Sequence, residues 1–239
     1  IPVTPKNEIR KIKIKFNKPS LDNLKAYSDC LLQSLSEEYR NIHISFDLLK
    51  EIPSILDSDN ENYFLAIKDN EIVNIETQEL KNYGLAFDIG TTTIVGLLVD
   101  LDTGKTVKVA SRTNPQVVAG ADVITRINYS LNEKDGLTKL QKLVISAINE
   151  IINELCININ FDSKNIYSIA LAGNAVMNHL LLGVNPKSMA FAPYVPVYHF
   201  ISDIKAKNLS LNINPSASVY ILPNISGFVG GDIVALILA

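Results

Sequence analysis

The sequence predicts an α/β protein in two parts. In residues 1–80, charged and apolar side chains alternate in one short segment, and the pattern of a hairpin follows. From residue 83, three apolar strands succeed one another, and strands then alternate with segments of helical periodicity. This order indicates a small N-terminal α/β domain (residues 1–80) and a ribonuclease-H-like lobe (residues 81–239) with a mixed five-stranded sheet and flanking helices.

The N-terminal part is predicted to begin with a half-buried strand over residues 11–16, where lysine alternates with apolar residues. Ser20, which follows Pro19, is expected to cap a helix. The apolar positions of that helix are Leu21, Leu24, Leu31, Leu32 and Leu35.

A second, shorter helix is expected from Ser45 to Leu49, ending before Pro53. Residues 63–67 and 72–75 then form a hairpin across residues 69–70, an Asp-Asn pair that tolerates left-handed turns. No cluster of reactive side chains occurs in this part of the sequence, so we expect a linker, docking or dimerisation module.

The lobe is predicted to start with three strands joined by two turns, near residues 83–89, 93–101 and 105–113. A polar stretch then leads into helical segments over residues 122–132 and 137–155. The remaining elements alternate: a buried strand over 166–172, a helix over 174–182, a strand over 219–222 and a helix from Val229 onward.

The composition excludes several classes of function. A net charge of −3 and a pI near 5.7 give no electrostatic basis for binding nucleic acid or an anionic membrane. No apolar run approaches the roughly 20 residues that span a bilayer. Cys30 and Cys156 lie far apart in apolar segments, which indicates two buried thiols of a cytoplasmic protein rather than ligands of an iron–sulfur cluster or a structural zinc.

The most informative segment is the polar turn Asp88-Ile-Gly-Thr-Thr-Thr93 between two apolar strands. Gly90 admits backbone conformations closed to other residues and lets another atom come close. Thr91, Thr92 and Thr93 offer hydroxyl and N–H groups around one concavity, as in nests that bind phosphate oxygens. Asp88 ends the first strand and is placed to hold a hard cation through water. The alternative is a hairpin in which the threonines only cap a turn.

Further motifs give the chain a family resemblance that covers nearly its whole length. The turn itself is shared by the superfamily of acetate kinases, sugar kinases, heat-shock chaperones and actins. The other segments, in their order, resemble those of the ATP-dependent reductive activators of corrinoid proteins: Asn114-Pro-Gln116, Gly120–Ile127, Gly173–Gly183, Ala192–Pro196 and Leu222–Asp232.

The resemblance implies ATP-dependent electron transfer from an iron–sulfur domain to Co(II) of a corrinoid protein, which restores Co(I) for methyl transfer. ATP and Mg²⁺ are the implied cofactors. The chain resembles the linker and middle regions of the family, so the iron–sulfur cluster is expected in an N-terminal domain missing here, and a second phosphate loop after Ala239. The corrinoid is expected on a partner protein, because the chain lacks the D-x-H-x-x-G pattern of corrinoid-binding modules. A homodimer is also expected.

The resemblance assigns roles to the residues of the turn. Asp88 is expected to hold Mg²⁺ through water, and the β- and γ-phosphates are expected to contact Gly90, Thr91, Thr92 and Thr93. Asp232 is the candidate that orients or deprotonates the attacking water, because its Gly-Gly-Asp setting occupies the place of Gly-Asp-Gln in glycerol and sugar kinases. The alternative for Asp232 is an aspartate that caps the following helix.

Four weaker candidates complete the predicted nucleotide site: Gln116, Asp122, Gly173 and Asn174. Asp122 has an alternative role in an exposed i, i+4 ion pair with Arg126. Gly173 and Asn174 follow a strand and open a helix whose N-terminus could face the nucleotide. His179, in that helix, is expected to be a hydrogen-bonded core residue.

Two other functions stay open from the sequence. One is a small-molecule kinase of the same superfamily, which would transfer the phosphoryl group to a sugar or a carboxylic acid. The other is a non-catalytic module, in which residues 1–80 and the surface of the lobe dock a partner and the single lobe binds ATP only weakly.

Overall fold

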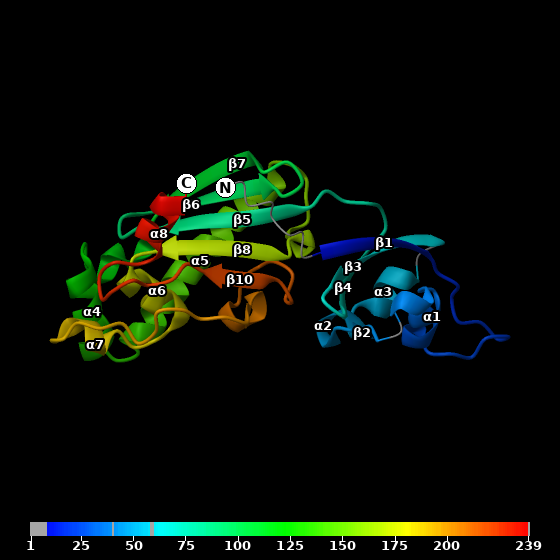
Figure 1. Ribbon diagram of the computed structural model, residues 1–239, viewed down its shortest axis with the longest axis horizontal. Helices are drawn as coiled ribbons and strands as arrows, with labels where there is room; N and C mark the ends of the chain where they lie inside the picture. Colours follow the sequence, from blue (N-terminus) through cyan, green and yellow to red (C-terminus); the bar gives the residue numbers. More distant parts are fainter. Residues whose placement is uncertain (1–8, 40, 58–59, 239) are drawn as a thin grey trace. The chain divides into compact units, whose positions relative to one another are not determined.

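The computed structural model describes residues 9–39, 41–57 and 60–238. The chain forms two compact units, residues 1–82 and residues 83–239. Each unit has its own hydrophobic core and its own sheet (Figure 1). No helix within the described ranges has both the length and the apolar character that crossing a bilayer requires.

The N-terminal unit combines a four-stranded sheet with short helices. Its strands are β1 (Ile9–Lys15), β2 (His43–Ile44), β3 (Asn62–Lys68) and β4 (Glu71–Glu76), and its helices are α1 (Tyr27–Gln33), α2 (Phe46–Leu49) and α3 (Ile52–Leu56). The strand order is β1-β3-β4-β2, and only the pair of β2 and β4 is parallel. The predicted hairpin is confirmed as β3 and β4, with Asp69 in the left-handed region (φ 52°). The predicted cap of α2 is confirmed too, because Ser45 Oγ accepts a hydrogen bond from the N–H of Leu48 (3.2 Å).

The first helix of this unit differs from its prediction. Helix α1 begins at Tyr27 and not after Ser20. Leu21 and Leu24, expected on its buried face, are 93% and 86% exposed. Ser20 instead pairs with Asn23 through reciprocal backbone hydrogen bonds of 3.1 and 2.9 Å. The side chain of Asn23 donates to Cys30 Sγ (3.6 Å), so backbone groups close this turn and the Asn23 side chain links it to α1.

The second unit is the predicted ribonuclease-H-like lobe. Its strands are β5 (Tyr83–Ile89), β6 (Thr93–Asp100), β7 (Lys105–Thr113), β8 (Ser168–Gly173), β9 (Ile204–Lys205) and β10 (Ser218–Ile221). Its helices are α4 (Val123–Asn132), α5 (Gly136–Ile157), α6 (Ala175–Leu182), α7 (Lys187–Ala190) and α8 (Gly231–Leu238). The sheet order is β7-β6-β5-β8-β10-β9, in which β5, β6 and β7 form an antiparallel meander and β8 and β10 run parallel to β5.

The sheet of the lobe has six strands where the sequence predicted five. The additional strand, β9, consists of two residues at the sheet edge and pairs antiparallel with the start of β10. Two residues are too few to show the alternation of apolar and polar side chains by which a strand is recognised in a sequence.

The long helix α5 packs against β6 and β7. Its fully or nearly fully buried residues recur at spacings of three and four: Leu140, Val144, Ala147, Ile148, Ile151, Ile152 and Leu155. Gly96 in β6 allows the close approach, because a Cβ there would lie 2.6 Å from Ile151 Cγ2 and 2.8 Å from a ring carbon of Phe87. The strand that begins at the polar turn is thereby held against the core.

The carboxyl ends of β5 and β8 lie at the same edge of the sheet. The two strands are parallel, with Asp88 opposite Ala172 and Ile89 opposite Gly173. In Figure 1 their arrowheads point toward α8, which contacts β8. Ligands of open α/β sheets bind outside the carboxyl ends of the strands, so this edge is where a site is expected.

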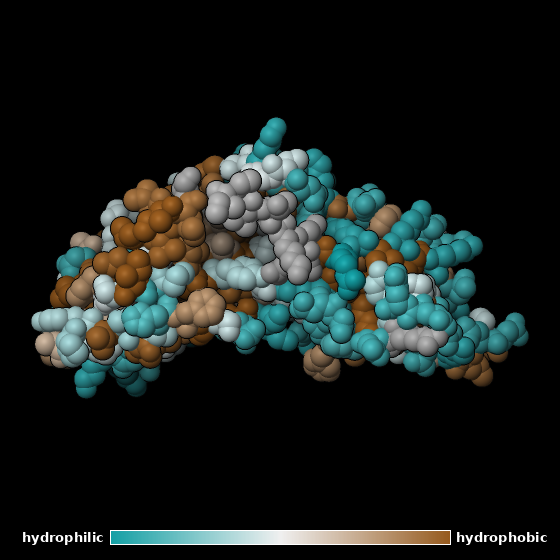
Figure 2. All heavy atoms as spheres, in the orientation of Figure 1, coloured by the Kyte–Doolittle hydropathy of each residue, from teal (hydrophilic) through white to brown (hydrophobic). Residues whose placement is uncertain are grey.

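Helix α8 exposes an apolar surface. Leu236, Ile237 and Leu238 are 74–76% exposed, and Ile233 on the preceding turn is 41% exposed. Figure 2 shows hydrophobic side chains gathered over the region of α8. Contiguous exposed apolar side chains mark a contact surface more often than single ones do.

Candidate phosphate-binding site

The turn between β5 and β6 is closed by one backbone hydrogen bond. The N–H of Gly90 donates to the carbonyl oxygen of Thr93 at 3.0 Å. A Cβ on Gly90 would lie 2.7 Å from that oxygen, which is closer than a side-chain carbon approaches. As the sequence predicted, another atom comes close to residue 90, and glycine is the residue that permits it.

Buried side chains hold the carbonyl groups of this turn from the inside. The side chain of Asn114 donates from Nδ2 to the carbonyl oxygen of Gly90 (2.8 Å), and the backbone N–H of Asn114 donates to the carbonyl oxygen of Thr92 (2.7 Å). Arg126 donates from Nη2 to the carbonyl oxygen of Thr91 (2.5 Å). Asn114 and Arg126 are fully buried, so these carbonyl groups point into the protein.

The N–H groups of the turn therefore point outward. In a trans peptide, the N–H of each residue lies opposite the C=O of the residue before it. Because the carbonyl groups of Gly90 and Thr91 point inward, the N–H groups of Thr91 and Thr92 point away from the core, and they have no hydrogen-bond partner among the described residues. The side chains of Thr92 and Thr93 are exposed beside them. Successive free N–H groups of this kind can form a nest for an anion.

Two carboxylates from different elements lie in the same region. Asp88 is the second-to-last residue of β5, directly before the polar turn, and Asp232 is in the first turn of α8. The pKa of Asp88 is raised, first because protein atoms displace water from its carboxyl group and second because the negative charge of Asp232 is near. No group of three or more His, Cys, Asp or Glu side chains in the described chain is placed to hold a metal by itself. Mg²⁺, however, is commonly bound through one or two carboxylates together with water and phosphate oxygens.

The start of α8 packs directly on the turn between β8 and α6. A Cβ on Gly230 would lie 2.4 Å from the nitrogen of Ala175 and 2.5 Å from the carbonyl oxygen of Gly173. Asn174 caps α6 with its side chain. The fold thus brings Gly173, Asn174 and Asp232 together at the sheet edge where β5 ends.

Asp232 does not have the position of a helix cap. Helix α8 begins at Gly231, so Asp232 lies within its first turn, and its Oδ1 accepts a hydrogen bond from the N–H of Ile233 (2.9 Å). A negative charge in the first turn interacts favourably with the helix dipole. This local role leaves the second carboxylate oxygen available to a ligand or to water.

Gln116 and Asp122 have structural positions in this fold. Gln116 is fully buried: its Nε2 donates to the carbonyl oxygen of Leu140 (2.9 Å), and its Oε1 accepts from Arg126 (3.3 Å). It lies behind the turn and does not fit the expected contact with a nucleotide. Asp122 caps α4 and accepts hydrogen bonds from the N–H (2.9 Å) and the hydroxyl group (2.8 Å) of Thr125. These hydrogen bonds lower the pKa of Asp122.

Sequence reasoning missed Asn114, Arg126 and Gly230 as residues that shape the site. The proposed alternative of an exposed ion pair between Asp122 and Arg126 is wrong, because Arg126 is 0% exposed and its guanidinium donates to inward-facing carbonyl groups. The i, i+4 spacing does not reveal which side of a helix faces the core. All three residues lie in motifs that carry the family resemblance, and this was the signal that could have identified them.

His179 is confirmed as a core residue. It is fully buried; Nδ1 donates to the carbonyl oxygen of Ala175 (2.6 Å), and Nε2 accepts from the N–H of Val197 (3.0 Å). Its ring stacks on that of Tyr198, with centroids 4.8 Å apart. Burial lowers the pKa of His179. The neutral ring therefore fastens residues 197–198 to α6 and takes no part in the phosphate site.

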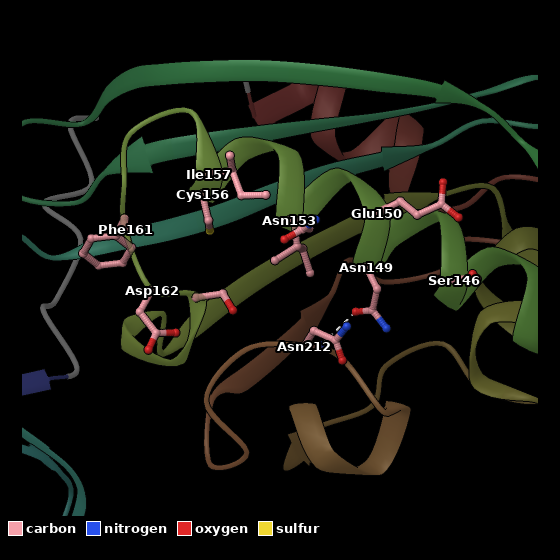
Figure 3. A pocket seen from close by; sticks show the side chains of 11 residues that line it. Ser146, Asn149, Glu150, Asn153, Cys156, Ile157, Phe161, Asp162 and Asn212 are labelled. Carbon is pink, nitrogen blue, oxygen red and sulfur yellow. Dashed lines mark hydrogen bonds between the residues drawn. The ribbon is translucent and has the colours of Figure 1, made fainter. Parts of the chain in front are cut away.

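A separate pocket of about 610 Å³ lies along the C-terminal half of α5 (Figure 3). Asn149 and Cys156 project into it from the helix, and the N–H of Asn212 donates to Asn149 Oδ1 (2.8 Å). Phe161, at one side of the pocket, packs edge-on against Tyr83, with ring centroids 4.8 Å apart. Since Tyr83 is the first residue of β5, the pocket lies near the amino end of that strand and the polar turn lies at its carboxyl end. The pocket is therefore not part of the phosphate site.

Comparisons with known proteins agree with one another. Residues 1–82 match the family model of the RACo linker region, and residues 83–239 match that of the RACo middle region. The chain is 35% identical over 196 residues to the corrinoid activation enzyme RamQ of Eubacterium limosum, an alignment that covers 77% of this chain and 33% of that protein. It is similar in structure to a reductive activator for a corrinoid iron–sulfur protein, with a TM-score of 0.73 and 34% identity, over 97% of this chain and 38% of that chain. The chain thus spans about a third of the length of these relatives.

Proposed function

Because the chain belongs to the RACo family, whose linker and middle regions it spans, we propose that it is the ATP-binding part of a reductive activator of a corrinoid protein. In the proposed reaction, the complete protein transfers one electron from an iron–sulfur centre to Co(II) of its corrinoid partner, which becomes Co(I). Binding and hydrolysis of MgATP are coupled to that transfer. The similarity to two corrinoid activators, one in sequence and one in structure, supports this proposal.

The observation that carries the nucleotide part of the proposal is the outward-facing turn at residues 90–93 beside two carboxylates. Thr91 and Thr92 would donate their N–H groups to oxygens of the β- and γ-phosphates. Asp88 would hold the accompanying Mg²⁺ through water. The positive charge of the cation would also offset the repulsion from Asp232, which contributes to the raised pKa of Asp88.

Asp232 would act on the water that attacks the γ-phosphate. A general base needs to reach its proton directly or through one water molecule, and the charge of Asp232 is close enough to Asp88 to affect its pKa. The start of α6, with Gly173 and Asn174, would form the adjacent wall of the site, because it is in backbone contact with Gly230.

Hydrolysis can drive an unfavourable electron transfer only through a change of conformation or of partner affinity. A nucleotide shifts such an equilibrium by the difference of its affinity for the two states. Cys30 and Cys156 are buried free thiols, one in each unit. The electron donor is therefore expected in another part of the complete protein or in a separate iron–sulfur protein.

The test measures ATP hydrolysis by the complete protein, with and without a Co(II) corrinoid partner. We expect the partner to accelerate hydrolysis, and Asp88→Ala to abolish it because the cation is no longer held. Asp102→Ala is the matched control, since it removes an exposed aspartate from the hairpin at the far end of β6 and should leave hydrolysis unchanged. An Asp88→Ala protein with unaltered ATPase activity would end the assignment. Phosphoryl transfer to a sugar or a carboxylic acid, in place of hydrolysis, would favour the kinase alternative.

We further propose that the N-terminal unit is the linker and dimerisation module of a cytoplasmic homodimer. Its separate hydrophobic core and its match to the linker region support a distinct role for this unit. Analytical ultracentrifugation of the complete protein tests the dimer. A monomer mass at micromolar concentration would contradict it.

A further inference from the structure

Arg126 in α4 is a fully buried arginine that forms no close ion pair among the described residues. Its guanidinium donates to the carbonyl oxygens of Gly120 (3.0 Å) and Thr91 (2.5 Å), to Gln116 Oε1 (3.3 Å) and to Met177 Sδ (3.4 Å). Within the part of the chain that the structure describes, no carboxylate oxygen lies within the 4.0 Å of an ion pair with it. All its hydrogen-bond partners are neutral, and the charge of Asp122 at the start of α4 acts on it only from beyond ion-pair distance.

A buried charge without a close ion pair is costly, so its presence in this position points to a use of the charge itself. Neutral acceptors of this kind can be satisfied by neutral donors, which carry a smaller desolvation penalty. The guanidinium keeps its proton even when burial lowers its pKa. Asp122 supplies a counter-charge at longer range, and a negative group on the outer side of the turn would supply one directly beyond the peptide that Arg126 contacts.

The peptide between Thr91 and Thr92 connects this charge to the outer side of the turn. Its C=O accepts from Arg126, and its N–H points the opposite way, toward the proposed phosphate. A hydrogen bond to the C=O of a peptide also polarises its N–H, which strengthens the hydrogen bond that the N–H donates. Arg126 thus acts on the anion site through one peptide unit.

We propose that Arg126 is the positioning residue of the phosphate turn. It holds the Thr91 carbonyl group inward, so that the Thr92 N–H faces the ligand, and its charge favours an anion on the other side of the same peptide. It does not touch the ligand. This inference rests on the proposed ATP site at residues 90–93.

A purely structural role for Arg126 makes a different prediction. The side chain also ties α4 to Gly120 and to Met177 in α6, so its removal lowers stability whatever ligand is present. A positioning role predicts, in addition, that affinity falls only for ligands whose phosphates reach the turn. MgATP carries the β- and γ-phosphates, and AMP lacks them, so the ratio of the two affinities separates the two roles.

The experiment measures the affinities of the complete protein for MgATP and for AMP by calorimetry, in the wild type and in two variants of Arg126. Arg126→Met is expected to lower the affinity for MgATP by about tenfold or more and to leave that for AMP unchanged. Arg126→Lys keeps the charge but lacks the forked donors that reach Thr91 and Gly120 together, so an intermediate loss is expected. Ile148→Ala removes a fully buried side chain of α5, which makes it the control for reduced stability, and both affinities should stay unchanged.

Two results would overturn the proposal: equal losses of MgATP and AMP affinity in Arg126→Met, or no loss of either. If Arg126→Met does not fold, Arg126→Lys decides by the same ratio, and an unchanged ratio counts against the proposal. A wild-type protein that binds no MgATP would instead refute the ATP site itself, so failure of the proposed function is distinguishable from failure of this inference.

Discussion

Replacing Gly230 with alanine tests whether the start of α8 must touch the turn between β8 and α6. A Cβ at this position would lie 2.4 Å from the nitrogen of Ala175 and 2.5 Å from the carbonyl carbon of Asn174 and the carbonyl oxygen of Gly173. Ordinary contact begins near 3.4 Å, so the added carbon is about 1 Å too close. All three neighbours are backbone atoms, which cannot rotate away as the end of a side chain can.

The first turn of α8 must therefore move away from the sheet edge. Forcing additional atoms into a packed region costs about 1–3 kcal/mol, and we expect the free energy of unfolding of the lobe to fall by about this amount. Asp232 moves with the helix, so its negative charge acts more weakly on Asp88. The pKa of Asp88 is then expected to fall toward its usual value.

Urea unfolding followed by circular dichroism measures the first effect, and a carbon NMR titration of the carboxyl groups measures the second. Gly104→Ala is the control, because a Cβ there meets no atom within 4 Å, whereas its φ of +68° makes alanine cost about 1 kcal/mol. Gly104 lies in the hairpin between β6 and β7, so this variant should leave the pKa of Asp88 unchanged. If Gly230→Ala altered neither the stability nor the pKa of Asp88, the close approach of α8 and the joint site of Asp88 and Asp232 would both be refuted.

Three other measurements check further parts of the structure. Asp232→Asn should lower the pKa of Asp88, as followed by NMR. The pKa should not reach its ordinary value, because displacement of water is the larger cause of the raised pKa and remains. An unchanged pKa would show that the charge of Asp232 does not act on Asp88. The lowered pKa of His179 means that, below about pH 6.5, the unfolded chain binds a proton that the folded lobe excludes. The contribution of His179 to the free energy of unfolding should therefore be complete above that pH and decrease as the pH falls toward the folded pKa. If the free energy of unfolding of His179→Phe depended on pH in the same way, another group would be responsible for the effect. Burial raises the pKa of the Cys156 thiol to about 11. Iodoacetamide at about pH 8 should therefore alkylate Cys156 at least about tenfold more slowly in the folded protein than in the urea-unfolded protein. Equal rates would contradict the burial of this thiol.

The secondary structure of the lobe was predicted well where elements are long and periodic. The strand over residues 83–89 and the helical stripe of α5 were found because many residues repeat one pattern. Strand β9, with two residues, has too little sequence to show a pattern. The helix predicted over Leu21 and Leu24 is absent for another reason. The apolar spacing suits a helix, but reciprocal backbone hydrogen bonds between Ser20 and Asn23 close a turn there.

The candidate site was predictable in its residue types but not in its assembly. Asp88 and Gly90 stand out in the sequence because a glycine-containing polar turn between apolar strands is a local signal. The sequence predicted Gln116 in the nucleotide site and offered an exposed ion pair for Arg126, yet both side chains are buried behind the turn. Burial depends on what packs against a side chain, and that is a property of distant parts of the chain.

The sequence by itself determined the order of the long strands and helices of the lobe, the composition of the polar turn and the family of the chain, because these follow from patterns in the sequence alone. Only the tertiary structure decided which way the turn faces. Asn114 and Arg126, from later parts of the chain, hold its carbonyl groups inward and so direct its N–H groups outward. It also decided that Asp232 acts on Asp88, since the parallel pairing of β5 with β8 and the packing of α8 bring distant segments to one sheet edge.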